Sequence, residues 1–216
     1  MQPPYRAGYE APLLPPPPLY SRVITLGLAS VAIMGVSLGA LWLVHAIDLV
    51  ELDAIESHTV AEWVGPVESL LTLASQLARL IGAIVFMIWI HGAVTNTQAI
   101  KRPMSITPGW AIGWYFIPIA SLWMPYKTMG ELVTHSDARE IVITPPTVLA
   151  WWGLFITGNM LRILATLLRT AIGTSGFVVV QIFASLALTG SLVALASLML
   201  MIHRGQEEFV RQLRRP

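Results

Sequence analysis

The sequence predicts an all-α integral membrane protein: a bundle of four transmembrane helices plus a proline-broken helical segment that re-enters the membrane or lies at its interface. Two observations carry this prediction. Only 12% of the 216 residues are charged, against about 25% in soluble proteins, and 55% are hydrophobic. Four apolar stretches also reach the roughly 20 residues that a helix needs to cross about 30 Å of hydrocarbon. They cover residues 23–46, 69–93, 148–168 and 176–202.

The predicted membrane domain covers residues 22–204 and is flanked by two segments of different composition. Residues 1–21 contain the run "PLLPPPPLY", which cannot form a packed core, so we expect a disordered cytoplasmic tail. Residues 205–216 form a short basic tail that we also expect in the cytoplasm. Between the first two spans, residues 47–68 hold six acidic residues and no lysine or arginine. That composition predicts an external loop.

Residues 108–132, "PGWAIGWYFIPIASLWMPYKTMGEL", are as apolar as a span but contain three prolines and three tryptophans. A proline inside a helix costs about 3 kcal/mol, because it removes a backbone donor and clashes with the preceding turn. We therefore expect a re-entrant or interfacial helix pair over 108–126, hinged near Pro118. A kinked fifth span is the alternative. The residues that define this broken-helix motif are Pro108, Gly109, Trp110, Trp114, Pro118, Trp123, Pro125 and Tyr126.

The positions of the basic residues favour the re-entrant arrangement. Eleven of the 13 lysines and arginines lie outside the four spans. If 108–126 turns back, ten of them share the side of the two termini, and Arg169 alone lies on the other side. If 108–126 crosses, the division becomes five to six. Cytoplasmic flanks carry the excess of basic residues, so we expect four spans with both termini in the cytoplasm.

The motif of residues 108–132 resembles that of an uncharacterised bacterial family of multi-pass membrane proteins, defined only as a domain of unknown function, with a PGWAxGWxFxPxxxLWxPY-type pattern. The preceding stretch, "FMIWIHGAVTNTQAI", is also similar to that family. This chain has Gly92, Thr95 and Gln98 where the family commonly has arginines. The resemblance implies a protein of the bacterial plasma (inner) membrane and brings no activity. Further family-like positions are Trp89, Asn96 and Glu131.

Two arginines, Arg79 and Arg162, fall inside predicted spans. An arginine at the bilayer centre costs from ~2.5 to more than 10 kcal/mol, so it normally faces protein or water and is paired. Each has an amide three residues earlier on the same helical face, Gln76 and Asn159. No acid lies in the central part of a span, which leaves backbone carbonyls freed by the prolines, or an anionic ligand, as partners. The four residues therefore either join helices by hydrogen bonds or form an anion, headgroup or substrate site, and Arg162 also lies near enough to a span end to snorkel.

Chemistry of other kinds has little support in the sequence. HExxH, GxSxG and GxxxxGK[ST] motifs are absent, as is an intramembrane carboxylate, so we expect no enzyme and no catalytic residue. The chain has no cysteine, and we expect no metal site. His91 and His203 near the cytoplasmic span ends could ligate a haem axially, but without an attachment motif or a second histidine in either span we expect no cofactor. A net charge of +1 disfavours nucleic acid as a partner.

Two classes of function fit these observations. The favoured one is a non-enzymatic accessory, sensory or assembly module in the lipid bilayer, which binds a second copy of the chain or a membrane partner protein through its tails and helix faces. The alternative is a small transporter or a lipid- or anion-binding protein with its site near Arg79 and Arg162.

Overall fold

The computed structural model of the chain describes residues 18–53, 58–100, 104–136 and 144–213. Most of the proline-rich tail and the last three residues of the basic tail lie outside the described residues. Within the described part, all regular structure is helical, and four helices are long and apolar enough to span a membrane. The prediction of an all-α protein with four such helices is confirmed.

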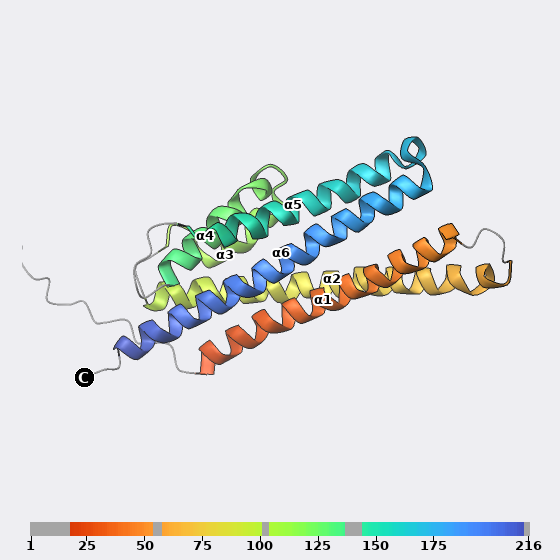
Figure 1. Cartoon of the computed structure of the whole chain (residues 1–216). Coiled ribbons are helices and arrows are strands. Elements are labelled where there is room, and N and C mark those ends of the chain that lie inside the picture. The colour runs from red at the N-terminus through yellow and green to blue at the C-terminus, as the bar shows by residue number, and fades with distance from the viewer. Residues whose placement is uncertain (1–17, 54–57, 101–103, 137–143, 214–216) are drawn as a thin grey trace, which may run out of the picture.

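The first two long helices form a hairpin (Figure 1). Helix α1 runs over Pro18–Asp53 and α2 over His58–Ile100, in close contact with each other. Both extend beyond the predicted spans, so most of residues 47–68 is helical, and the prediction of a loop there is wrong in its extent. Asp48, Glu51, Glu62 and Glu68 all lie within these helices, and glutamate is among the better helix formers. Pro66 also lies within α2 without ending it.

The last two long helices form a second hairpin with a tighter turn than predicted. Helix α5 covers Pro146–Leu167 and α6 covers Arg169–Leu213, so residues 169–175 are largely helical instead of forming an open connection. Gly173 interrupts α6 near its start with φ 68° and ψ 178°. Only glycine adopts such a backbone without a steric penalty, and this residue lets the chain reverse direction within a few residues.

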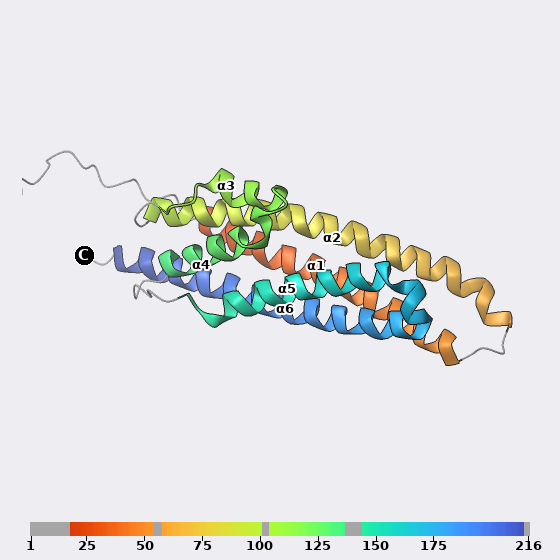
Figure 2. The same ribbon diagram turned by 90° about the horizontal axis from the view of Figure 1, so that it is seen from above.

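The segment between the two hairpins consists of short helical pieces. Helix α3 (Pro108–Gly113) leads into the 3-10 turn η1 (Trp114–Phe116), and a second 3-10 turn, η2 (Ala120–Leu122), precedes α4 (Met124–Ser136). The reversal of direction lies between η1 and η2, where Pro118 stands. Figures 1 and 2 both show α3 and α4 beside one half of the long helices.

Contacts with α2 show that this segment returns to the end from which it starts. The Gln98 amide nitrogen donates to the Ile106 carbonyl (3.1 Å), and the Thr97 and Ser136 hydroxyls lie 3.0 Å apart. In between, the Tyr115 ring packs against Phe86, which stands 11 residues earlier than Thr97 on α2. At 1.5 Å per residue, the segment penetrates roughly 16 Å along α2 and comes back.

We call the segment from α3 to α4, residues 108–136, the inserted hairpin. The core is concentrated at the end of the bundle where this inserted hairpin packs. Its largest fully buried side chains come from α2, α4, α5 and α6. A buried polar network joins three of these helices there, because the Gln206 amide nitrogen donates to the Thr97 hydroxyl (2.8 Å) and to the Ala93 carbonyl (3.2 Å), beside Ser136 of α4. The large, fully buried apolar side chains of this core are Trp89, Ile90, Val94, Met129, Leu132, Val148, Leu198 and Met199.

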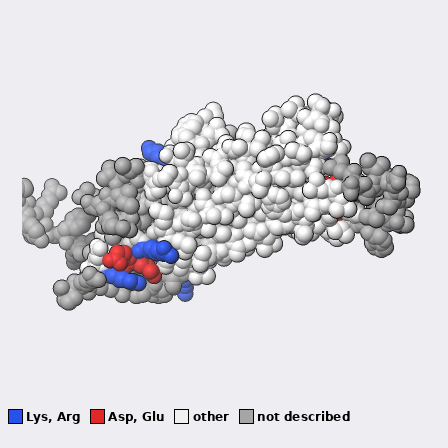
Figure 3. Space-filling view, viewed as in Figure 1, with Lys and Arg blue, Asp and Glu red and all other residues white. Residues whose placement is uncertain are grey.

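The outer surface of the long helices is apolar. Leu70, Leu80 and Val36 are each at least 60% exposed. In Figure 3 the charged side chains gather mainly near the end where α1 begins and α6 ends, and the long middle of that face carries none. A surface of this kind is energetically unfavourable in water and favourable in hydrocarbon.

Close packing of α5 on α6 generates the first prediction. A Cβ atom on Gly158 would lie 2.7 Å from Leu188 Cγ and 3.0 Å from the Ala184 carbonyl oxygen, whereas one on Gly153 of the same helix meets nothing within 4 Å. We expect Gly158→Ala to lower the free energy of unfolding by about 1–3 kcal/mol through overpacking. Gly153→Ala should leave it unchanged or raise it by up to about 1 kcal/mol. Thermal unfolding in detergent checks both, and equal effects would contradict the packing described.

Candidate functional site

Arg79 and Arg162 line one recess of about 350 Å³ between α2 and α5. The two helices run in opposite directions (Figure 1). Side chains on a helix lean toward its N-terminus, so the two arginines lean toward each other from different levels. The antiparallel arrangement thus brings together two cations that stand 83 residues apart in sequence.

Neither guanidinium is fully paired. Nη2 of Arg79 and Nη1 of Arg162 are buried and have no hydrogen-bond partner. Among the described residues, no aspartate or glutamate forms an ion pair with either arginine. The two guanidinium groups line the same recess and carry the same charge, so they repel each other. Two half-buried cations that face one recess without a counterion form a site that is complementary to an anion.

The two predicted amide partners differ in their position. Asn159 lines the recess, and its amide nitrogen donates to the Phe155 carbonyl of its own helix (2.8 Å), which leaves its second N–H for another acceptor. Gln76 is exposed and lies outside the recess. The structure therefore brings together Arg79, Asn159 and Arg162 and leaves Gln76 apart, because spacing along a helix fixes which residues share a face but not which face meets a neighbour.

A second hollow of about 280 Å³ lies deeper in the bundle and shares Arg79 and Asn159 with the recess. Its walls are mostly apolar and aromatic and come from α1, α2, η1, α5 and α6. The hydroxyl oxygen of Tyr115 is buried and has no partner. Sequence reasoning missed this hollow, since aromatic residues in apolar helices give no signal that separates a pocket wall from ordinary core. The lining residues are Met34, Ser37, Leu38, Arg79, Ala83, Phe86, Met87, Tyr115, Trp151, Trp152, Phe155, Asn159, Leu188, Ser191, Leu192 and Leu195.

The first part of the broken-helix motif forms the start of the inserted hairpin. Thr107 caps α3 by accepting a hydrogen bond from the Trp110 backbone nitrogen, and Pro108 occupies the first helical turn, where its missing N–H costs nothing. The next residue, Gly109, has open space around its α-carbon. Trp110 and Trp114 stack with ring centroids 4.6 Å apart. This end of the hairpin is thus fixed by a cap and a ring pair.

The second part of the motif fixes the turn and the return. Pro125 is buried in the first turn of α4, a position that tolerates proline, and Tyr126 packs against the core. The Trp123 side chain is 52% exposed. Carbonyls released near the prolines are taken by side chains, since Ser121 donates to Pro118 (2.7 Å) and the Trp152 indole nitrogen donates to Leu122 (2.7 Å). These particular carbonyls therefore do not serve as partners for the arginines.

The family-like positions contribute to the support of the hairpin. Trp89 is only 1% exposed, and a Cβ on Gly27 would lie 2.8 Å from its Nε1, so α1 approaches α2 closely there. Glu131 accepts hydrogen bonds from the backbone nitrogen and the hydroxyl of Ser105, which holds the entry to α3 against α4. Asn96 is buried, with its amide nitrogen unpartnered.

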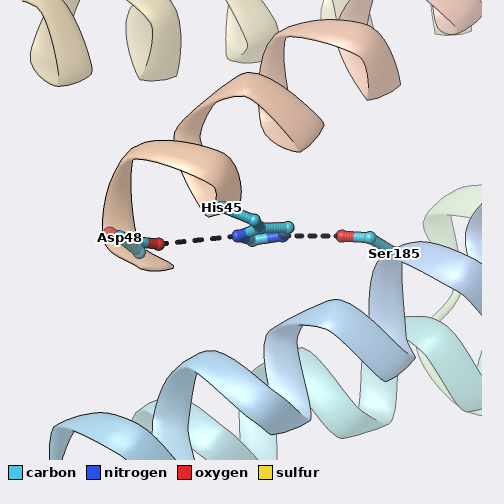
Figure 4. A network of polar contacts seen from close by, with 3 residues as sticks. All are labelled: His45, Asp48 and Ser185. Carbon is cyan, nitrogen blue, oxygen red and sulfur yellow. Dashed lines mark hydrogen bonds and ion pairs between the residues drawn. The ribbon is translucent and has the colours of Figure 1, made fainter. Parts of the chain in front are cut away.

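A polar contact between α1 and α6 escaped the sequence analysis. His45 Nε2 lies 2.9 Å from the Ser185 hydroxyl and Nδ1 lies 3.6 Å from the Asp48 carboxylate (Figure 4). The residue types match a Ser-His-Asp triad, but Ser185 is completely buried and lines neither hollow, so a substrate has no visible route to it. One helical turn away, the Trp42 indole donates to Thr189 (3.3 Å). We refer to these five residues of α1 and α6 as the interhelical clasp; they are Trp42, His45, Asp48, Ser185 and Thr189.

The remaining histidines considered for a cofactor are separate from these features. His203 lies 3.3 Å from Glu207 one turn further along α6, and His91 is exposed. In the part of the chain that the structure describes, no cluster of three histidine, aspartate or glutamate side chains is arranged to hold a metal ion.

Four helices that are long and apolar enough to span a membrane, a hairpin packed on three of them, and two unpaired arginines beside an apolar hollow define an all-helical protein with a candidate anion site. The family described as "Domain of unknown function (DUF4328)" matches residues 52–205, and the chain belongs to this family. No curated protein and no solved structure matches the chain.

The interhelical clasp gives the second prediction. Ser185→Ala removes the partner of a buried imidazole, so we expect the free energy of unfolding to fall by about 1 kcal/mol, the usual range for polar contacts between membrane helices. Ser197→Ala on the same helix is the matched control, because the Ser197 hydroxyl is exposed and bonds only to the Val193 carbonyl of its own helix. Thermal unfolding of the two variants in detergent makes the comparison, and an unchanged Ser185→Ala protein would remove the clasp as a stabilising contact.

Proposed function

We propose that this protein is a non-enzymatic membrane protein that binds an anionic group between α2 and α5. The observation that carries the proposal is the pair of buried, unpartnered guanidinium nitrogens of Arg79 and Arg162 in one recess. Cations inside membrane helices are retained at a considerable energetic cost, and a counterion supplied by a ligand offsets that cost. The geometry thus favours the lipid- or anion-binding alternative over a module that acts only through its tails and outer faces.

The other interpretation of the arginines is hydrogen bonding between helices. It has less support, because the hydrogen bonds between long helices in the described residues come from other side chains, such as Ser37 to the Ser75 carbonyl (2.8 Å) and Ser191 to the Trp151 carbonyl (2.9 Å). In addition, two like charges that line one recess repel each other, so they oppose a close approach of α2 and α5.

The arrangement in the membrane is part of the same proposal. The long helices cross the bilayer of a bacterial plasma membrane, and the α3–α4 hairpin enters from the cytoplasmic side and returns to it. Both termini are cytoplasmic. Support comes from the return of the hairpin to the Thr97 end of α2 and from the excess of basic residues at that end. A hairpin that breaks its helix at this depth needs protein cover, and α2, α5 and α6 provide it.

The arginine pair predicts two effects of opposite sign on the free energy of unfolding, one without ligand and one with phosphate. In Arg79→Gln and Arg162→Gln, the loss of a poorly paired buried cation should raise the free energy of unfolding of the ligand-free protein by about 1–3 kcal/mol. The same variants should lose the stabilisation that inorganic phosphate gives to the wild-type protein, which follows RT ln(1 + [L]/Kd) for a ligand that binds only the folded state. Thermal unfolding in a non-ionic detergent, with phosphate titrated at constant ionic strength, measures both effects.

Arg204→Gln is the matched control, since Arg204 is exposed near the far end of α6. It should change neither quantity. If the two buried-arginine variants are instead less stable than the wild type, and phosphate stabilises them equally, the arginines are structural and the proposed function fails.

The proposed orientation is tested by labelling, because the chain has no cysteine of its own. Thr170, Ser105 and Glu208 are exposed and lie at the two ends of the bundle. With a membrane-impermeant maleimide, we expect Thr170→Cys to react in intact cells, and Ser105→Cys and Glu208→Cys only after the cells are opened. A crossing 108–126 segment gives a different pattern, in which Glu208→Cys reacts in intact cells and Thr170→Cys does not.

A further inference from the structure

The arginine recess continues into the apolar interior of the bundle. Arg79 and Asn159 line both the recess between α2 and α5 and the inner hollow of about 280 Å³. One side of Arg79 therefore belongs to a charged site and the other to an apolar one. A ligand that fills both has a charged end and an apolar end.

The inner hollow has the walls of a binding pocket. Its aromatic side chains form a connected series, with ring centroids 5.8 Å apart for Phe86 and Tyr115, 6.3 Å for Tyr115 and Trp152, and 5.1 Å for Trp152 and Phe155. Aliphatic and methionine side chains from α1, α2 and α6 complete it. Walls of this kind are typical of sites for small apolar ligands, and empty space among them forfeits dispersion contacts that a ligand restores.

The volume of the inner hollow limits the ligand. An apolar cavity of about 150 Å³ holds one benzene ring, so a hollow of about 280 Å³ has room for roughly eleven carbon atoms. One hydrocarbon chain of medium length fits this space. The two full-length acyl chains of a bilayer phospholipid do not.

We propose that the ligand is an amphiphile with one hydrocarbon chain and an anionic head, with the head between Arg79 and Arg162 and the chain in the inner hollow. This inference rests on the proposed anion site and adds the class of ligand. A phosphate head and a carboxylate head share the required chemistry, because both are oxyanions that accept hydrogen bonds from guanidinium groups. Asn159 supplies a further N–H where the head and the chain meet.

The experiment distinguishes binding of the ligand's hydrocarbon chain from binding of its anionic head by filling the inner hollow with a larger side chain. Ala83 lines the hollow but not the arginine recess, so Ala83→Phe occupies the space of the chain, and Ala83→Leu fills it less. Ala74→Phe on the same helix is the matched control, since Ala74 is exposed and lines neither hollow. The probes are inorganic phosphate, dodecyl phosphate, dodecanoate and dodecanol. Their affinities are obtained from thermal shifts of the full-length protein at one fixed concentration of non-ionic detergent. Partition of each probe into micelles is then the same for every variant.

We expect the wild-type protein and Ala74→Phe to bind dodecyl phosphate, dodecanoate or both more tightly than inorganic phosphate, and not to bind dodecanol. The amphiphile bound more tightly identifies the head. Ala83→Phe should lower the affinity for that amphiphile by about tenfold or more, because single methylene changes in an apolar pocket already alter binding by such factors. Its affinity for inorganic phosphate should be unchanged. Ala83→Leu should give a smaller loss, and it serves as the test variant if Ala83→Phe does not fold.

Two results would overturn this inference in distinguishable ways. In the first, the Ala83 variants bind the amphiphile as tightly as Ala74→Phe does, while Arg79→Gln and Arg162→Gln abolish binding of every anion. The hydrocarbon chain of the ligand is then not in the inner hollow, and the anion site stands. If the arginine variants bind all anionic probes like the wild type, the anion site itself fails, and the inference fails with it.

Discussion

The structure depends on one constraint: polar groups in an apolar environment must find their hydrogen-bond partners within the protein. Most of the hydroxyls in the long helices satisfy it locally, as Thr95 does with the His91 carbonyl and Thr166 with the Arg162 carbonyl. Where prolines break the helix, Ser121 and Trp152 donate to the freed carbonyls. Some buried polar atoms lack a partner, the Asn96 amide nitrogen and the Tyr115 hydroxyl among them, but of these side chains only Arg79 and Arg162 carry a permanent charge. They mark the place in the described residues where a buried charge is left without a partner.

The inserted hairpin explains why the constraint remains unmet at that place. Helix α2 packs along α1, and α5 packs along α6, so each long helix has one extensive neighbour within its own hairpin. The α3–α4 hairpin lies beside both α2 and α5 at the end with the larger core, and it holds the two apart there. Beyond its tip, side chains of both α2 and α5 border open space in the part of the chain that the structure describes. The recess and the inner hollow occupy that part of the bundle.

The sequence was sufficient for the long helices, because hydrophobic runs of this length leave few alternatives. Their ends were placed less well, since the prediction tracked hydropathy, and Asp48 or Glu68 changes hydropathy without stopping a helix. Arg79 and Arg162 could be identified because a charge in an apolar run is conspicuous. Gln76 was grouped with them wrongly, as helical spacing does not tell which face is turned inward. The contact of His45 with Ser185 depends on the register between α1 and α6, and a single sequence contains no information on that register.

The indole of Trp152 belongs to two parts of the structure at the same time. Its nitrogen holds the Leu122 carbonyl at the turn of the inserted hairpin, and its ring forms part of the wall of the inner hollow beside Tyr115 and Phe155. A single rigid, planar group thus joins the hairpin tip to the cavity. Any displacement of the ring changes the shape of the cavity and the position of the turn together, and the hairpin extends from that turn to the Ser136 end of the bundle. The fold therefore contains a mechanical linkage between its interior and one of its ends.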